Sequence, residues 1–146
     1  MASTEGGCLC GAIRYRLAET PTEFGACHCG MCRKSSGGVG LAMEVPDGGL
    51  TFTEGEDRIA SFQSSDWAER AFCPVCGSGL YWRMTAEGPA KGLTILNAGT
   101  LDDMNGMAFT HEIYVDNQPD CYAFAGERKR MTEAEVIEMV SGGGEH

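Results

Sequence analysis

The chain has 146 residues, of which 42% are apolar and 22% are charged, and this composition fits one globular domain over residues 1–146. Eleven lysine and arginine residues against 21 aspartate and glutamate residues give a formal net charge of −10. A field of this sign repels phosphate backbones and anionic lipid surfaces. We therefore expect no nucleic acid partner and no membrane partner.

Residues 1–7 (MASTEGG) contain neither the basic segment nor the apolar segment of a secretory signal. No apolar run approaches the roughly 20 residues that span a bilayer. We therefore expect a cytoplasmic protein. In a reducing compartment, the eight cysteines of this chain indicate metal or redox chemistry rather than a disulfide framework.

Short segments of alternating polarity predict strands along most of the chain. Residues 11–17 (GAIRYRL) place Ile13, Tyr15 and Leu17 on one face. The other predicted strands are 39–45, 50–54, 58–63, 69–73, 79–84, 93–97 and 112–116. Turn residues separate these segments, and crossover helices are missing between them, so the pattern predicts a mainly β domain rather than a parallel βαβ sheet.

One helix is predicted near the end of the chain. Thr132 and Glu135 have the spacing of a capping box, and Val136, Ile137 and Val140 form an apolar face. This pattern predicts a short C-terminal helix over 132–141. The glycine-rich residues 141–146 are expected to form a flexible tail.

Seven of the eight cysteines lie in three short motifs, and only Cys121 stands alone. The motifs are Cys8-Leu9-Cys10-Gly11, Cys27-His28-Cys29-Gly30-Met31-Cys32 and Cys73-Pro74-Val75-Cys76-Gly77. Zinc is bound by thiolates in tetrahedral geometry, and both CxxC turns and a CxC on an extended strand can direct two sulfurs toward one ion. A glycine after Cys76 fits a tight metal-binding turn. Redox use of Cys29 and Cys32 would require a βαβ context that the pattern lacks.

Seven thiolates divide naturally into four and three. Four complete a structural zinc site, and three leave one position open, as in catalytic zinc sites. Cys27, Cys29 and Cys32 supply three sulfurs within six residues, which leaves Cys8 and Cys10 to pair with Cys73 and Cys76. The spacing equally permits Cys8 and Cys10 to pair with Cys29 and Cys32.

In these motifs the sequence resembles the glutathione-dependent formaldehyde-activating enzyme family, also called the GFA or centromere-protein-V domain. Further matching segments are Arg33-Lys34-Ser35-Ser36-Gly37, Gly77-Ser78-Gly79-Leu80-Tyr81, Ala98-Gly99-Thr100-Leu101-Asp102-Asp103, and His111 with Ile113. The resemblance covers about residues 6–115. It implies small zinc-stabilised antiparallel β-sheets in a tent-like arrangement. It departs at Gln118-Pro119-Asp120-Cys121-Tyr122, where the family often has a tryptophan after the proline.

The resemblance implies two zinc ions per chain. The structural ion would be bound by Cys8, Cys10, Cys73 and Cys76, and a labile catalytic ion by Cys27, Cys29 and Cys32. It also implies a carbon–sulfur lyase that condenses glutathione with formaldehyde to S-hydroxymethylglutathione, so the expected partners are a small-molecule thiol and an aldehyde. Three thiolates on Zn²⁺ carry a net charge of −1, which suits delivery of a thiol better than activation of water.

Several residues near the three-cysteine motif have competing interpretations. Arg33 and Lys34 can hold a carboxylate of a ligand such as glutathione, or they can belong to a solvated turn. His28 should point away from a zinc shared by Cys27 and Cys29. His111 is either a structural histidine or a polar group that faces the site.

Two other functions are compatible with these motifs. One is a non-catalytic zinc-binding interaction module, and the other is a zinc or thiol buffer. The sequence leaves the identity of the substrate and the oligomeric state open, with a homodimer as one option.

Overall fold

The computed structural model describes the backbone of residues 1–145 and the side chains of residues 1–140. Strands are the main elements, and they form two sheets. The three-stranded sheet has the order β1-β2-β5, with β1 Glu5–Gly7, β2 Arg14–Leu17 and β5 Leu50–Glu54. Both of its pairings are antiparallel.

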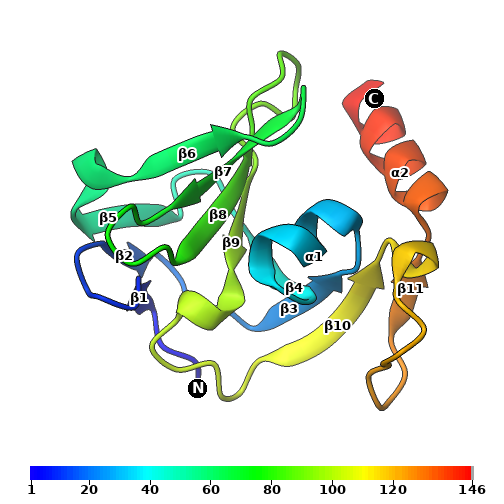
Figure 1. The fold of residues 1–146 in the computed structure, drawn as a ribbon, viewed down its shortest axis with the longest axis horizontal. Helices are drawn as coiled ribbons and strands as arrows, with labels where there is room; N and C mark the ends of the chain where they lie inside the picture. Colours follow the sequence, from blue (N-terminus) through cyan, green and yellow to red (C-terminus); the bar gives the residue numbers. More distant parts are fainter. Residues whose placement is uncertain (146) are drawn as a thin grey trace.

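The larger sheet contains eight strands in the order β11-β10-β3-β4-β9-β8-β7-β6. Their bounds are β3 Glu23–Cys27, β4 Gly40–Val45, β6 Ala60–Gln63, β7 Ala68–Phe72, β8 Gly79–Met84, β9 Thr94–Asn97, β10 Ala108–Ile113 and β11 Lys129–Met131. The sheet bends strongly, so that β6 to β9 face the small sheet while β3, β10 and β11 extend away from it (Figure 1). Three 3-10 turns complete the chain: η1 Glu56–Arg58, η2 Ala98–Thr100 and η3 Val115–Asn117.

The hydrophobic core fills the space between the two sheets. Ile13 and Tyr15 from the start of β2 meet Leu80 of β8 and Leu96 of β9, and all four side chains are fully buried. Cys8 and Cys73 belong to the same core cluster. The predicted period-2 alternation therefore places the expected residues inside, and it confirms the mainly β fold class.

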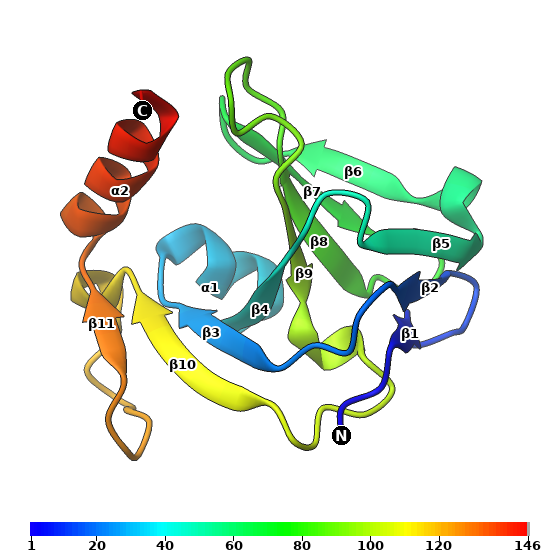
Figure 2. The same cartoon turned by 180° about the vertical axis from the view of Figure 1, so that it is seen from behind.

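The prediction of antiparallel sheets is only partly right. β3 pairs with β10 in parallel, and β10 pairs with β11 in parallel. These three strands lie side by side at one edge of the large sheet (Figure 2). The pairing of β3 with β10 joins segments that are more than 80 residues apart, so no local pattern could indicate its direction.

A short helix, α1 Gly30–Ser36, follows β3 and was not predicted. None of its residues is buried, so it lacks the apolar period that would reveal it. Its ends are fixed locally instead. The Cys29 sulfur accepts a hydrogen bond from the Cys32 backbone N–H, and Gly37 adopts φ 80 and donates its N–H to the Arg33 carbonyl.

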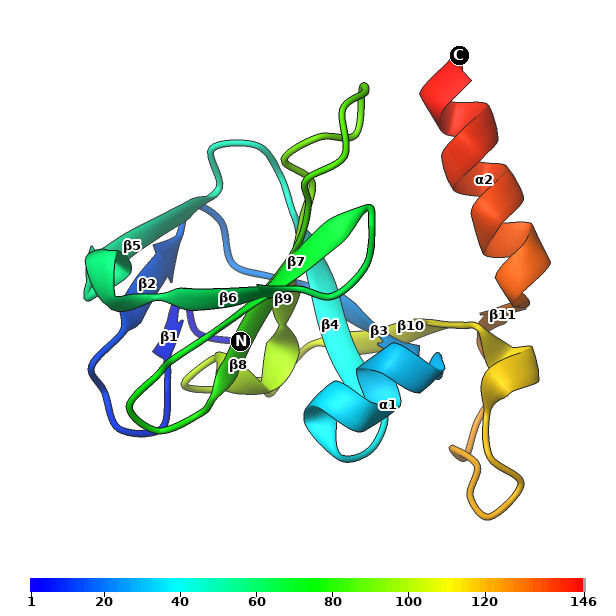
Figure 3. The ribbon, with the colours of Figure 1, turned by 45° about the horizontal axis from the view of Figure 1, so that its top comes forward.

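The predicted C-terminal helix is confirmed as α2 Glu133–Glu145. The capping box forms as expected, because Thr132 Oγ1 accepts from the Glu135 N–H and the Glu135 carboxylate accepts from the Thr132 N–H. The helix continues through Glu145, beyond the predicted end at 141, and His146 lies outside the described residues. α2 projects from the body next to η3 (Figure 3). Within residues 1–145, none of the helices has the length and apolar character to cross a membrane.

Candidate metal centres

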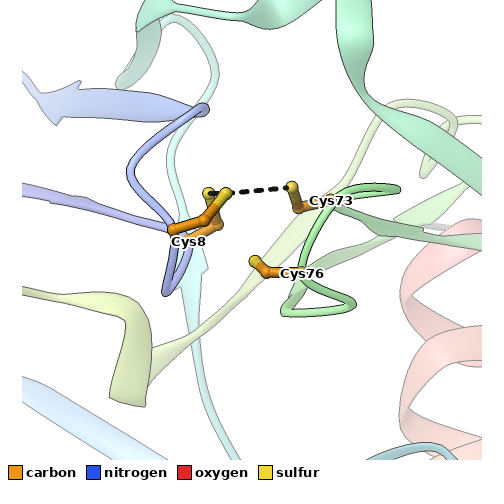
Figure 4. A group of neighbouring side chains, drawn as sticks. Cys8, Cys73 and Cys76 are labelled. Carbon is orange, nitrogen blue, oxygen red and sulfur yellow. Dashed lines mark hydrogen bonds between the residues drawn. The ribbon is translucent and has the colours of Figure 1, made fainter.

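The first cysteine cluster, called the four-cysteine centre, joins two distant turns of the chain. Cys8 and Cys10 follow β1, and the other two sulfurs come from the turn between β7 and β8. Cys8, Cys73 and Cys76 direct their sulfur atoms toward one another in Figure 4. The Sγ–Sγ distances are 3.6 Å for Cys8 and Cys10 and 3.8 Å for Cys10 and Cys73. All four sulfurs lie within 4.8 Å of one another.

These distances fit a tetrahedral zinc ion. Zinc–sulfur bonds of about 2.3 Å place neighbouring sulfurs roughly 3.8 Å apart. Two of the ligand candidates are deeply buried, since Cys8 and Cys73 are 6% and 1% exposed. The sequence left the partner of Cys8 and Cys10 open, and the structure brings them to Cys73 and Cys76. The role of these four residues as ligands remains a prediction.

The turns of this centre have a common geometry. Gly11 and Gly77, the residues after Cys10 and Cys76, both adopt φ 81, a conformation that favours glycine. The Gly11 N–H donates to the Cys8 carbonyl, and the Gly77 N–H donates to the Cys73 carbonyl. The expectation that the Cys8–Cys10 pair lies on an extended strand is wrong, because Leu9 and Cys10 form a turn.

Polar groups also surround the sulfurs of the four-cysteine centre. The Ile13 backbone N–H lies 3.3 Å from Cys8 Sγ, and the Ser78 hydroxyl lies 3.2 Å from Cys76 Sγ. The hydrogen bond with Ser78 lowers the pKa of Cys76 to about 5. Donors to sulfur stabilise thiolates, and a metal-binding thiolate needs that stabilisation.

The second cluster, called the three-cysteine centre, is local in sequence. Cys27 ends β3, Cys29 caps α1, and Cys32 lies in the first turn of α1. The three sulfurs lie within 4.8 Å of one another and are partly exposed. Hydrogen bonds from the Cys27 and Cys32 thiols lower the pKa of Cys29, so the cluster favours a thiolate at Cys29.

A fourth cysteine does not complete this second group among the described residues. Cys121 is exposed and belongs to neither cluster. Three soft sulfur donors at metal-ligand spacing fit zinc, and a tetrahedral ion would keep one position for another ligand. Arg33 and Lys34 lie exposed in the last turn of α1, close in sequence to Cys32.

Arg70 is a residue of the three-cysteine centre that the sequence analysis missed. It extends from β7, and its Nη2 donates to Cys32 Sγ at 3.5 Å while its Nη1 donates to the Ser35 hydroxyl at 3.3 Å. Its Nε is buried and has no partner among the described residues. The Arg70 guanidinium therefore places a positive charge beside a cluster of thiols. No motif signals it, because β7 reaches this point only through the long-range pairing of the sheet.

Tyr114 lies at the end of β10 and has φ 56, which makes it the single non-glycine residue with positive φ within the described chain. Such a conformation costs on the order of 1 kcal/mol. β10 ends at Ile113, three residues before the predicted boundary at residue 116. Burial raises the pKa of Tyr114, and the nearby thiolates of the three-cysteine centre raise it further.

The two histidines of the sequence analysis do not join the sulfurs. His28 is 1% exposed and hydrogen-bonds Glu112 and Tyr122. It thus points away from its neighbouring cysteines, as expected, but into the protein rather than toward solvent. The His111 ring packs over Gly25, where a Cβ would overlap it, and its Nδ1 shares a hydrogen bond with Thr110. These contacts of His111 are those of a structural histidine.

Comparison with known proteins gives a consistent result. The sequence model of the family "Glutathione-dependent formaldehyde-activating enzyme" matches residues 3–117. An uncharacterized lyase of Schizosaccharomyces pombe is 30% identical over 140 residues, which cover 96% of this chain and 98% of that protein. A putative glutathione-dependent formaldehyde-activating enzyme of Halomonas elongata is 34% identical over 84 residues, which cover 53% of this chain and 54% of that protein.

A solved structure shares the fold. The crystal structure of a Rhodobacter sphaeroides protein superposes with a TM-score of 0.56 at 20% identity, and the match covers 73% of this chain and 99% of that chain. At this identity the similarity concerns the fold alone.

Proposed function

Because the chain belongs to the glutathione-dependent formaldehyde-activating enzyme family, we propose that it is a zinc-dependent carbon–sulfur lyase-like enzyme that joins a thiol to a small aldehyde. Glutathione and formaldehyde are the proposed substrates, in keeping with the names of the family and of its relatives. The observation that carries the proposal is the three-cysteine centre, where three sulfurs lie within 4.8 Å of one another. A tetrahedral ion held by three sulfurs would keep one position for the sulfur of a substrate.

The chemistry needs a thiolate close to an aldehyde carbon. Cys27, Cys29 and Cys32 would hold a zinc ion, and zinc bound there would lower the pKa of the substrate thiol toward neutrality. The thiolate sulfur donates an electron pair to the carbonyl carbon, so that a carbon–sulfur bond forms. The π electrons of the carbonyl move to its oxygen, and the proton lost by the thiol returns there through water to give the hydroxymethyl thioether.

The surrounding side chains suit this reaction. Arg70 offsets the surplus negative charge that three thiolates bring, and its free N–H groups can hydrogen-bond the oxygen on which charge develops. Arg33 and Lys34 supply positive charge on α1 for the carboxylates of glutathione.

The test is the rate at which S-hydroxymethylglutathione forms from glutathione and ¹³C-labelled formaldehyde, followed by NMR with two zinc ions loaded per chain. Thiols also react with formaldehyde without a catalyst, so the uncatalysed rate is subtracted. We expect acceleration by the wild type and none by Cys29→Ser. Cysteine and dithiothreitol, used as alternative thiols, show whether the carboxylates of glutathione matter. Equal rates with and without the wild-type protein would contradict the proposal and favour a binding module or a zinc buffer.

A further inference from the structure

Behind the three-cysteine centre lies a buried chain of polar side chains that the proposed reaction does not use. His28 Nε2 donates to Glu112 Oε1 at 2.7 Å, and Arg128 Nη1 donates to Glu112 Oε2 at 2.7 Å. His28 Nδ1 shares a hydrogen bond with the Tyr122 hydroxyl at 2.9 Å. His28 and Glu112 are 1% and 0% exposed, and the Arg128 side chain is 9% exposed. A second cation, Arg130, lies 3.6 Å from the Glu112 carboxylate.

This network is directly attached to two of the sulfur donors. His28 lies between Cys27 and Cys29, and its backbone N–H donates to the Ile113 carbonyl at 3.1 Å. The Cys27–Cys29 segment is therefore tied to β10 through both its backbone and the His28 ring. Because adjacent residues share one backbone, an anchored His28 ring restrains the backbone from which the flanking cysteines extend.

Arg128 is itself held on several sides. Its Nη2 donates to the Ala125 carbonyl at 2.6 Å, and its guanidinium lies 3.9 Å from the centre of the Phe109 ring. Phe109 in turn packs edge-on against Phe124. The Arg128 head group thus has one defined position, from which it bonds the Glu112 carboxylate.

The network also joins the segment that matches the family model to the segment that follows it. His28 and Glu112 lie within the matched residues 3–117, whereas Tyr122, Arg128 and Arg130 lie beyond them. The match to the Schizosaccharomyces pombe lyase extends over 96% of this chain, while the match to the Halomonas elongata protein covers 53% of it. The segment after residue 117 therefore supplies a feature that the family motif alone does not contain.

A buried carboxylate between a histidine and an arginine is costly unless all of its partners are in place. Burial raises the pKa of Glu112, but the hydrogen bonds from Arg128 and His28 lower it by more, so the carboxylate is ionised in the folded protein. Removal of Arg128 would take away its strongest partner. The Glu112 carboxylate would then rearrange to form a hydrogen bond with another donor. The His28 ring, which is bonded to this carboxylate, would lose its fixed orientation.

We propose that Arg128 is a positioning residue for the three-cysteine centre, which acts through Glu112 and His28 to set the directions of Cys27 and Cys29 and hence the metal affinity of that centre. The inference rests on the proposed function in one respect, namely that this centre binds zinc. It adds that the segment after residue 117, not only the cysteine motif, determines how tightly the metal is held. Groups around metal ligands typically change metal affinity by about 10–100-fold.

The test compares the zinc affinity of both centres in the full-length chain by competition with a chromophoric chelator, together with the Co²⁺ absorption spectrum of each centre. In Arg128→Met we expect about 10–100-fold weaker zinc binding at the three-cysteine centre, a changed Co²⁺ spectrum there, and less than a twofold change at the four-cysteine centre. Arg128→Lys, which keeps one donor, should recover part of the affinity. Glu112→Gln, which keeps the side-chain volume, should weaken the same centre and is the second variant if Arg128→Met folds poorly.

Arg14→Met is the control for loss of an arginine–carboxylate pair outside this network. Arg14 pairs with Asp102 at an N–O distance of 2.6 Å, and the two side chains are 30% and 47% exposed. Arg14→Met should leave the three-cysteine centre unchanged. Wild-type affinity and spectrum in both Arg128→Met and Glu112→Gln would overturn the inference, and so would an equal loss at both centres. Either of these two outcomes would leave the proposed function standing, provided that the wild-type protein binds two metal ions. A wild-type three-cysteine centre that takes no metal would overturn the proposed function and this inference together.

Discussion

The two cysteine centres differ in how their ligands are distributed along the chain. The four-cysteine centre joins two turns that lie 63 residues apart between Cys10 and Cys73, and two of its residues belong to the hydrophobic core. The three-cysteine centre takes all its sulfurs from six consecutive residues at the junction of β3 and α1. A metal in the first centre would crosslink the fold, whereas a metal in the second would bind to a segment that the fold already holds.

This difference underlies our proposal that the four-cysteine centre is structural and the three-cysteine centre is catalytic. A site completed by four distant ligands can form only when the chain folds, so its binding free energy adds to folding stability. A local site with three ligands contributes less to folding, and its remaining position is available to a substrate. In our proposals the three-cysteine centre is also supported by neighbouring residues, namely Arg70, which bonds Cys32, and the His28–Glu112 pair.

The largest effect is expected for Cys73→Ser, which would remove a buried ligand from the four-cysteine centre. Since structural zinc sites contribute binding free energies of about 10–16 kcal/mol to folding in small domains, the variant should be unfolded or nearly so at 25 °C. Circular dichroism and urea denaturation measure this effect. Cys121→Ser is the control, since Cys121 is exposed and lies in neither centre. A cooperatively folded Cys73→Ser protein would show that the crosslink is dispensable.

Cys29→Ser should have a different outcome, because its centre does not hold the sheets together. We expect a folded protein with a melting temperature within a few degrees of the wild type and with no thiol–aldehyde turnover. Thermal unfolding and the NMR rate assay test both parts. An unfolded Cys29→Ser variant would mean that the division of roles between the centres is wrong, and wild-type turnover would remove the catalytic assignment.

An intermediate effect is expected for Arg70→Gln. Loss of a hydrogen bond to a charged group is worth about 1.5–3 kcal/mol, which corresponds to a roughly 10–100-fold lower kcat/KM. Zinc content should stay at the wild-type value, since Arg70 does not supply a metal ligand. Arg70→Lys should restore part of the rate. Unchanged steady-state kinetics in Arg70→Gln would exclude Arg70 from the reaction.

The smallest effect is expected for the Arg14–Asp102 ion pair near the four-cysteine centre. The hydrogen bond from Arg14 lowers the pKa of Asp102. The ion pair therefore stabilises the folded protein fully at any pH above the usual pKa of an aspartate, about 3.9. This stabilisation is lost only as the pH falls through the lowered pKa of Asp102. Asp102→Asn should therefore cost about 0.5 kcal/mol at both pH 6 and pH 8 in urea denaturation with zinc present. A cost that changes between these pH values would contradict this interpretation.

The sequence predicts the local parts of both centres and little of their surroundings. The three-cysteine motif, the turn at Gly77 and the capping box at Thr132 each depend on a few adjacent residues, and such patterns are visible without a structure. The choice between the two partners for Cys8 and Cys10 depends on chain topology, so the spacing left it open. The structure shows which sulfurs lie together.

The supporting residues could not be predicted, because long-range pairing brings them to the site. Arg70 approaches Cys32 across 38 residues, and Arg128 approaches Glu112 from a segment beyond the family motif. Helix α1 escaped detection since its residues are exposed and its length is only seven residues. The parallel pairing of β3 with β10 likewise has no local signature.

The most direct test of the two-centre account is the zinc content per chain of wild type and Cys29→Ser, measured by elemental analysis after purification without chelator. If the wild type holds less than two equivalents, both proteins are measured again after saturation with zinc and glutathione. The account predicts two zinc ions per chain in the wild type and one in Cys29→Ser. One zinc ion in both proteins after saturation would contradict it, and so would two in both.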